Sequence, residues 1–361
     1  MKTAMKPLQK QKSRRRISLS CALFLSFALL LSGCGKKNTD NIEEAMNSIK
    51  ELNYDAALES LDKAESLGEN IRLVERGRGI AYMGKTMYEE AIECFIASLS
   101  YSDGSLEKMD YDINYYLGTC YFKLGRYEEA IEVFDSILAL KKEECDAYYL
   151  RGVVKACAGR IDDACADFDM ALSLRKDDYD MLIRIFDVLN EQGYRNLGQD
   201  YLQAAMDGGT KKMTNFEKGR ISFYLEDYEN ARLYLEKARD ENGSAAVLFL
   251  GMTYETLGDN NYAVSVYNTY LSSGAEDPEV YNHLGLCLMK MGSYEDALNA
   301  FQTAMNIEEG NTIMQSLKMN EIIAYEYLGQ FKKAAVLMES YLKTYPDDAE
   351  AQREYIFLKS R

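Results

Sequence analysis

The chain has one histidine, three prolines and no tryptophan among its 361 residues. Histidine is the usual base of a catalytic triad and a common metal ligand. His283 alone leaves little from which to build either kind of site, and we interpret it as an ordinary helix residue. The sequence offers no catalytic residue, metal site or cofactor site, so the protein is not expected to be an enzyme.

Paired cysteine motifs are also missing. Eight cysteines are present, but no two have the CxxC spacing typical of zinc and redox sites. Six lie after residue 34, scattered through the expected helices, where cysteine serves as a small packing residue. An exported protein could form disulfides, and the pair best placed for one is Cys157 and Cys165, which flank one expected turn.

Basic residues are scarce beyond the first 33 positions. Those positions hold seven of the 42 Lys and Arg residues and no acid, which leaves 35 basic against 58 acidic residues, a balance of −23. Because binding to phosphates needs a basic face, nucleic acid is not expected as a partner. The acidic excess fits a soluble surface or basic partners.

The basic N-terminus is followed by an apolar run, Ile17 to Leu31, that only serines interrupt. As a helix this run would span about 22 Å, short of the roughly 30 Å hydrocarbon core of a bilayer. A charged region followed by a short apolar run is typical of a secretory signal peptide rather than of a permanent membrane helix.

The apolar run ends in Leu31-Ser32-Gly33-Cys34, which resembles the lipobox of bacterial lipoproteins. The resemblance implies cleavage of residues 1–33 and a diacylglyceryl thioether on Cys34. The two acyl chains of that lipid would give stable attachment to the cell membrane, where one chain would be marginal. Residues 34–40 would form a tether of about 20 Å on the extracytoplasmic side. The alternative is a cleaved secretory signal in which these four residues occur by chance.

Small residues recur through the rest of the chain at steps close to 34 residues. One opens each expected second helix: Ala57, Ala91, Ala130, Ala164, Gly198, Ala231, Ala263, Ala297 and Ala334. Twelve residues before each lie Ala45, Gly79, Gly118, Gly152, Phe186, Gly219, Gly251, Gly285 and Ile322. Glycine inside a helix costs about 1 kcal/mol relative to alanine, so its recurrence predicts close approach of a neighbouring helix.

A large apolar residue, such as Phe95, Phe134 or Phe168, lies four positions after the small residue of each second helix. This period and pattern resemble the tetratricopeptide repeat. The resemblance implies an all-α fold, a right-handed solenoid of about nine helical hairpins over residues 41–346. Residues 347–361 would add a capping helix, because Asp347 and Asp348 can cap it after Pro346.

Two departures from the repeat lead to further predictions. Repeat five has Phe186 and Gly198 in place of the usual small pair, and Gly208-Gly209 follows it. We therefore expect a hinge between repeats one to four and six to nine. Ser100 to Met109 is an insertion that should form a loop.

Gly79 to Thr86 matches GxxxxGK[ST], the phosphate-binding loop. That loop needs a strand before it and a helix after it. Here the preceding segment is expected to be helical, and Gly79 is the small residue of its repeat. We interpret the match as a coincidence and expect no nucleotide.

Some residues of the expected first helices are not required by packing and should face the concave side of a tetratricopeptide array. Arg76, Tyr115 and Tyr149 form one row. Asp112, Asp146 and Asp180 form a second row at 34-residue steps, and their alternative role is favourable charge at helix N-termini. Phe216 and Arg220 extend the stripe. Together these eight residues predict an acidic, aromatic groove for an extended basic peptide.

The sequence thus favours a membrane-anchored, extracytoplasmic scaffold that binds proteins or peptide segments. By analogy with lipid-anchored relatives of the resembled family, it would serve envelope assembly or position cell-wall enzymes. The alternative is a receptor for a small ligand, such as a glycan or peptidoglycan fragment, that uses the concave aromatic residues. The pattern by which some family members clamp a C-terminal carboxylate is absent, because Leu286 stands where asparagine would follow Asn282.

Overall fold

The computed structural model describes residues 40–209, 213–239, 243–307 and 313–361. These residues form nineteen helices and no strand. Residues 1–39, with the expected signal peptide, the lipidation site Cys34 and nearly all of the tether, lie outside the described part. None of the helices in the described ranges is long and apolar enough to cross a membrane.

Eighteen of these helices pair into nine antiparallel hairpins, and the predicted all-α hairpin array is confirmed. The first helices are α1 (Asp40–Lys50), α3 (Ile71–Gly84), α5 (Lys108–Lys123), α7 (Cys145–Cys157), α9 (Tyr179–Glu191), α11 (Asn215–Tyr224), α13 (Gly243–Leu257), α15 (Pro278–Met291) and α17 (Met314–Tyr327). The second helices are α2 (Tyr54–Ser66), α4 (Tyr88–Ser100), α6 (Tyr127–Leu140), α8 (Ile161–Leu174), α10 (Arg195–Gly209), α12 (Tyr228–Ala238), α14 (Asn260–Leu271), α16 (Tyr294–Ile307) and α18 (Phe331–Thr344).

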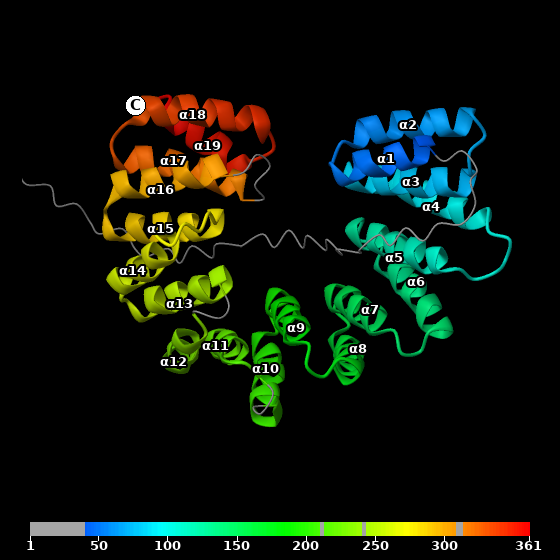
Figure 1. Ribbon diagram of the computed structural model, residues 1–361, viewed down its shortest axis with the longest axis horizontal. Coiled ribbons are helices and arrows are strands. Elements are labelled where there is room, and N and C mark those ends of the chain that lie inside the picture. The colour runs from blue at the N-terminus through cyan, green and yellow to red at the C-terminus, as the bar shows by residue number, and fades with distance from the viewer. Residues whose placement is uncertain (1–39, 210–212, 240–242, 308–312) are drawn as a thin grey trace, which may run out of the picture.

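The hairpins follow one another around an open arc, with the first and last hairpins facing each other across its mouth (Figure 1). Along the middle of the arc, the first helices α5, α7, α9 and α11 lie on the inner side and the second helices α6, α8, α10 and α12 on the outer side. Each hairpin packs mainly on its neighbours, so the core grows along the array. The first helices therefore supply the concave surface.

Within a hairpin, the recurring glycine lets a large side chain of the second helix reach the backbone of the first. A Cβ added at Gly79 would lie 2.5 Å from the Phe95 ring, and one added at Gly285 would lie 2.4 Å from the Phe301 ring. Phe95 and Phe301 are fully buried. The predicted close approach of the two helices is thus the packing that closes the six hairpins with glycine at this position.

Repeat five, α9 and α10, is spaced differently from the other hairpins. The backbones of most second helices lie close to the first helix of the next hairpin, but α8 approaches α9 less closely, and α10 approaches α11 less closely. Phe186 replaces the small residue of this repeat, and its ring packs 5.3 Å from that of Tyr224 in α11. The side chains of Phe186 and Tyr224 therefore fill the wider space between the backbones of this joint. The hinge expected at repeat five stays a prediction.

The insertion occupies residues 101–107, between α4 and α5. Arg72 of α3 holds its end in place by donating to Glu107 Oε2 at 2.9 Å and by pairing with Asp110, which is buried. At the other end of the chain, α19 (Ala349–Leu358) begins where Asp348 accepts hydrogen bonds from the backbone of Glu350 and Ala351. The predicted capping helix is confirmed.

None of the six cysteines among the described residues forms a disulfide, so Cys157 and Cys165 are not bridged. Burial raises the pKa of the Cys94 and Cys120 thiols to about 12. These cysteines are packing residues, as their scatter through the sequence indicated.

Candidate interaction surface

The eight candidate binding residues all lie on first helices, as expected. Arg76 is on α3, Asp112 and Tyr115 are on α5, Asp146 and Tyr149 on α7, Asp180 on α9, and Phe216 and Arg220 on α11. They therefore follow the inner side of the arc from its second to its sixth hairpin. Their roles in binding stay a prediction, but their surroundings differ from one another.

The two tyrosines of the first row belong largely to the core. Tyr149 is only 7% exposed, and its ring packs 6.2 Å from that of Phe168. Tyr115 packs in the same way on Phe134, and burial together with nearby Glu144 raises the pKa of its hydroxyl. Tyr149 thus offers almost no surface to a partner, contrary to the sequence interpretation, because its position on the helix also contacts the following hairpin.

The aspartate row is partly neutralised from within the chain. Arg175, which follows α8, donates to Asp146 Oδ2 at 2.7 Å. Arg220 of α11 donates to Asp180 Oδ1 at 2.6 Å. Burial raises the pKa of Asp112. Asp146 is therefore paired within its own repeat and Asp180 with the next hairpin, and neither is an unpaired acid.

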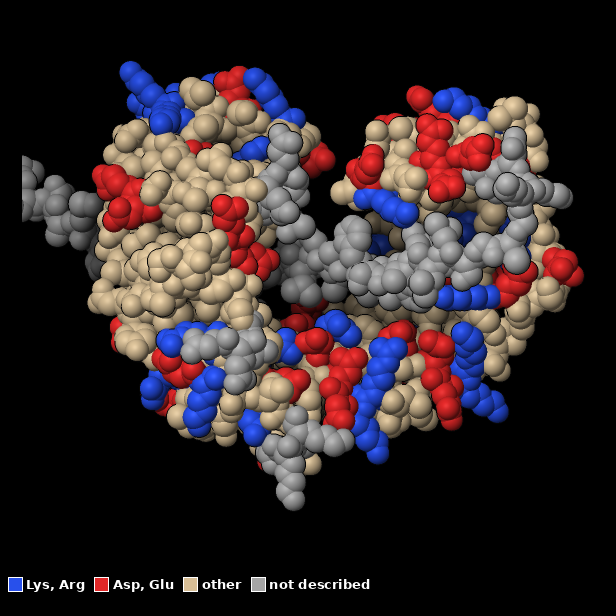
Figure 2. Space-filling view, viewed as in Figure 1, with Lys and Arg blue, Asp and Glu red and all other residues tan. Residues whose placement is uncertain are grey.

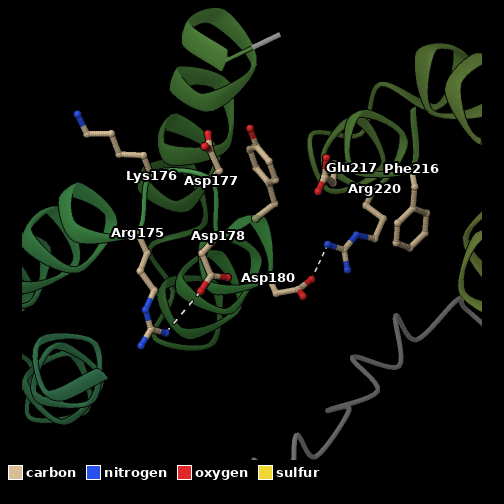
Figure 3. A pocket seen from close by; sticks show the side chains of 9 residues that line it. Arg175, Lys176, Asp177, Asp178, Asp180, Phe216, Glu217 and Arg220 are labelled. Carbon is tan, nitrogen blue, oxygen red and sulfur yellow. Dashed lines mark hydrogen bonds and ion pairs between the residues drawn. The ribbon is translucent and has the colours of Figure 1, made fainter. Parts of the chain in front are cut away.

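An open cleft lies beside this row, between the start of α9 and α11 (Figure 3). Its volume is about 680 Å³, and its lining includes Arg175, Asp178, Asp180, Phe216 and Arg220. The Arg220 guanidinium lies 4.7 Å from the centre of the Phe216 ring. Asp178 caps α9 by accepting from the Met181 amide at 2.8 Å. Most charges in this first cleft are therefore satisfied by the protein itself.

A second concave cleft, of about 850 Å³, crosses repeats six to nine. Its lining is largely apolar: Phe223, Met252, Leu286, Met289, Tyr294, Phe301, Ile323 and Tyr327, with the polar residues Glu255, Thr256, His283, Lys290 and Asn320. Tyr327 is 63% exposed, and its ring stacks 5.0 Å from that of Tyr294. We call this second cleft the apolar groove.

The apolar groove was missed by the sequence interpretation, although a signal for it exists. Met252, Leu286 and Ile323 each come directly after the small-residue position of their repeat, which Gly251, Gly285 and Ile322 occupy. Arg220 has the same place in repeat six, directly after Gly219. These four residues line the two concave clefts, so the residue type at this position gives part of the chemistry of the surface in repeats six to nine.

One polar network lies within the apolar groove. Glu255, whose side chain is 8% exposed, pairs with Lys290 and accepts from the Tyr267 hydroxyl at 3.0 Å. His283 also lines the groove, and burial lowers its pKa. The network satisfies the Glu255 carboxylate inside the protein, so the apolar row of the groove lies beside a paired carboxylate and ammonium group.

Charge is unevenly spread over the molecule. Figure 2 shows Lys and Arg side chains alternating with Asp and Glu over the lower part of the arc, where α7 to α10 lie, while a broad area over α13 and α14 carries little charge. The linings of the two concave clefts also differ: charged residues predominate in the first, and apolar residues in the second.

The segment Gly79 to Thr86 has the structure of a repeat. Residues up to Gly84 belong to α3, and Thr86 lies in the turn that follows, with a φ of 61°. No strand precedes it, since α2 and α3 are consecutive helices. Within the described ranges, no three His, Cys, Asp or Glu side chains are grouped so that they could hold a metal ion.

The arc of paired helices and its concave surface define an α-solenoid repeat protein. Family models described as tetratricopeptide repeat match residues 76–144, 278–311 and 322–348. The chain is therefore a tetratricopeptide repeat protein, as the pattern of small and large residues predicted.

The chain is similar to solved structures at low sequence identity, and the likeness to the first of them shows the fold. Yeast Tom70 is 12% identical, with a TM-score of 0.52, and the match covers 88% of this chain and 87% of that one. A tetratricopeptide repeat protein from Parabacteroides merdae is 15% identical, with a TM-score of 0.44, over 78% of this chain and 97% of that one. At these identities the likeness extends to the fold alone.

Proposed function

We propose that the protein is a lipid-anchored scaffold that holds segments of other proteins along its concave face, on the extracytoplasmic side of the cell membrane. The observation that carries this proposal is the continuous inner surface of first helices, on which both concave clefts lie. A preformed surface requires little ordering when a partner binds. The protein acts by display and alignment, without a catalytic step of its own.

The membrane part of the proposal rests on the sequence Leu31-Ser32-Gly33-Cys34. A thioether-linked lipid on Cys34 would keep the array near the bilayer, where it could assemble envelope components or position cell-wall enzymes. Replacing Cys34 by alanine is expected to move the protein from the membrane to the soluble fraction. An unchanged membrane fraction would refute the anchor but not the binding surface.

The binding part is tested by affinity purification of the tagged full chain from detergent-solubilised membranes. We expect a stoichiometric protein partner that is lost when Met289 is replaced by glutamate, because a charge in the apolar groove disfavours burial by a partner. Replacing Leu233 by glutamate is the matched control, since this residue is 46% exposed on α12, a second helix. Loss in both variants, or in neither, would contradict the concave site.

A receptor for a glycan or peptidoglycan fragment is the second candidate. It is favoured by the exposed, stacked pair Tyr294 and Tyr327 beside the amide of Asn320, since sugars bind aromatic faces with polar groups at their edges. Thermal stabilisation by a purified muropeptide, without a protein partner in the affinity purification, would favour this receptor over the scaffold.

A further inference from the structure

The last of the second helices begins with basic residues where others begin with acids. In α18, Lys332 and Lys333 directly follow Phe331. The equivalent positions of four other second helices hold two acids each: Glu89 and Glu90, Glu128 and Glu129, Asp162 and Asp163, and Glu295 and Asp296. Acids stabilise the N-terminus of a helix and cations destabilise it. Helix stability therefore does not account for the two lysines.

The end of α19 brings further cations to the start of α18. The Arg361 guanidinium lies 5.4 Å from the centre of the Phe331 ring and 4.8 Å from that of the Phe357 ring. Lys359 comes directly after α19 and is exposed. Figure 2 shows basic side chains grouped at this corner of the molecule, near the end marked C in Figure 1.

Two large apolar side chains are exposed among these cations. Ile356 is 71% exposed and Phe357 is 42% exposed, and both lie in the last turn of α19. We call the whole set the basic corner. It consists of Lys332, Lys333, Ile356, Phe357, Lys359 and Arg361.

The array itself does not neutralise the basic corner. The other basic residues of α18 and α19, Lys343 and Arg353, lie within 4.0 Å of Glu339 and Glu350. No Asp or Glu side chain in the described ranges comes as close to the four cations of the basic corner. Beyond residue 33 the chain carries 58 acids against 35 cations. The basic corner is therefore a local site for an anionic surface on an acidic molecule.

We propose that the basic corner docks on anionic phospholipid headgroups, with Ile356 and Phe357 inserted between them. Lysine and arginine are attracted to an anionic membrane surface, and exposed apolar side chains enter its headgroup region. The basic corner lies outside both clefts, so it fits a flat bilayer better than a protruding segment of a protein. The inference rests on the proposed function, because only a chain held at the membrane meets these lipids.

A second membrane contact would fix the orientation of the array. Residues 34–40 lead from the proposed lipid to the first hairpin, and the first and last hairpins face each other across the mouth of the arc (Figure 1). The lipid and the basic corner together would hold both ends of the arc at the bilayer. The acidic remainder of the chain is repelled by the same lipids, so the basic corner does not replace the lipid on Cys34.

The test uses tryptophan fluorescence, because the chain has no tryptophan of its own. The purified full chain carrying Ile356→Trp is reconstituted into vesicles of brominated phosphatidylcholine, with or without phosphatidylglycerol. Bromine quenches a tryptophan that enters the bilayer. We expect quenching only with phosphatidylglycerol, and its loss in about 1 M salt, where the Debye length falls to about 3 Å. Leu233→Trp, on α12, should be quenched in neither kind of vesicle.

The charge requirement is tested in the Ile356→Trp chain. Replacing Lys332 and Lys333 together by glutamine should lower the ratio of inserted to free tryptophan roughly 30-fold, because each lysine near an anionic surface favours binding about fivefold. The matched control replaces Lys141 and Lys142 by glutamine. Both are exposed lysines in the turn before α7, so the ratio should not change.

Equal quenching with and without phosphatidylglycerol, no quenching in either, or equal effects of the two lysine pairs would overturn the inference. Fractionation of the Cys34→Ala variant separates that failure from a failure of the proposed function. If loss of Cys34 still releases the protein from the membrane, the lipid anchor holds and the basic corner adds nothing to it.

Discussion

At the residue scale, the structure separates packing residues from surface residues more sharply than the repeat pattern does. The glycines and their aromatic partners could be predicted, because a glycine at a fixed place in successive helices has few other uses. Tyr149 could not be assigned correctly, because neighbouring positions on one helix face the concave surface and the next hairpin. The salt bridges of Asp146 and Asp180 were also missed, since their arginines lie 29 and 40 residues further along the chain.

Replacing Gly285 by alanine tests the packing of one residue. The new Cβ would lie 2.4 Å from the buried Phe301 ring, so the two helices must separate. Overpacking costs about 1 to 3 kcal/mol, and the better helix propensity of alanine returns about 1 kcal/mol. We expect a net loss of about 0 to 2 kcal/mol in the free energy of unfolding, measured by urea denaturation with circular dichroism.

The control is Gly208 in α10, where an added Cβ would have no heavy atom within 4 Å. Replacing Gly208 by alanine should leave stability unchanged or raise it by up to about 1 kcal/mol. Equal effects at Gly208 and Gly285 would contradict the packing argument.

At the element scale, two parts of the array depart from the regular repeat. The capping helix could be predicted from the sequence, because Asp348 is a good N-cap and the end of an array needs a cover. The contact of the capping helix with α17, in which Glu326 lies near Glu354, could not be predicted. Two acids repel each other, so no sequence pattern indicates that they are neighbours.

Docking of α19 is expected to depend on pH. The pKa of Glu326 rises from 4.5 to about 7 in the folded protein. The folded state therefore binds this proton more tightly than the unfolded state, and stability is lost as pH rises from about 4.5 through 7. The melting temperature of Glu326→Gln relative to the unmodified protein should rise between pH 5 and pH 8. A difference that does not change with pH would count against a shared proton.

Repeat five is the element expected to move. Because the α8 and α9 backbones, and those of α10 and α11, are less closely spaced, openings at these joints disturb fewer contacts. Hydrogen exchange should therefore be faster across residues 186–210 than across α7 and α8. Uniform protection over both regions would show that the aromatic side chains around Phe186 hold this joint as firmly as the others.

At the scale of the whole molecule, the array could be predicted and its surface could not. The 34-residue period gives the class, length and curvature of the protein, because each hairpin buries its apolar face only against its neighbours. The repeat pattern does not specify the concave side chains. The apolar groove could have been found from the residue that directly follows the small-residue position of each first helix. In repeats seven to nine these residues are Met252, Leu286 and Ile323.

The most direct test of the account is site-specific photo-crosslinking in intact membranes. The photoreactive amino acid p-benzoylphenylalanine would replace Tyr327, which lines the apolar groove and is 63% exposed, or Val336 of α18, a second helix, which is 67% exposed. The account predicts a discrete protein adduct from position 327 and none from position 336. An adduct from position 336 alone, or equal adducts from both positions, would contradict a concave binding surface.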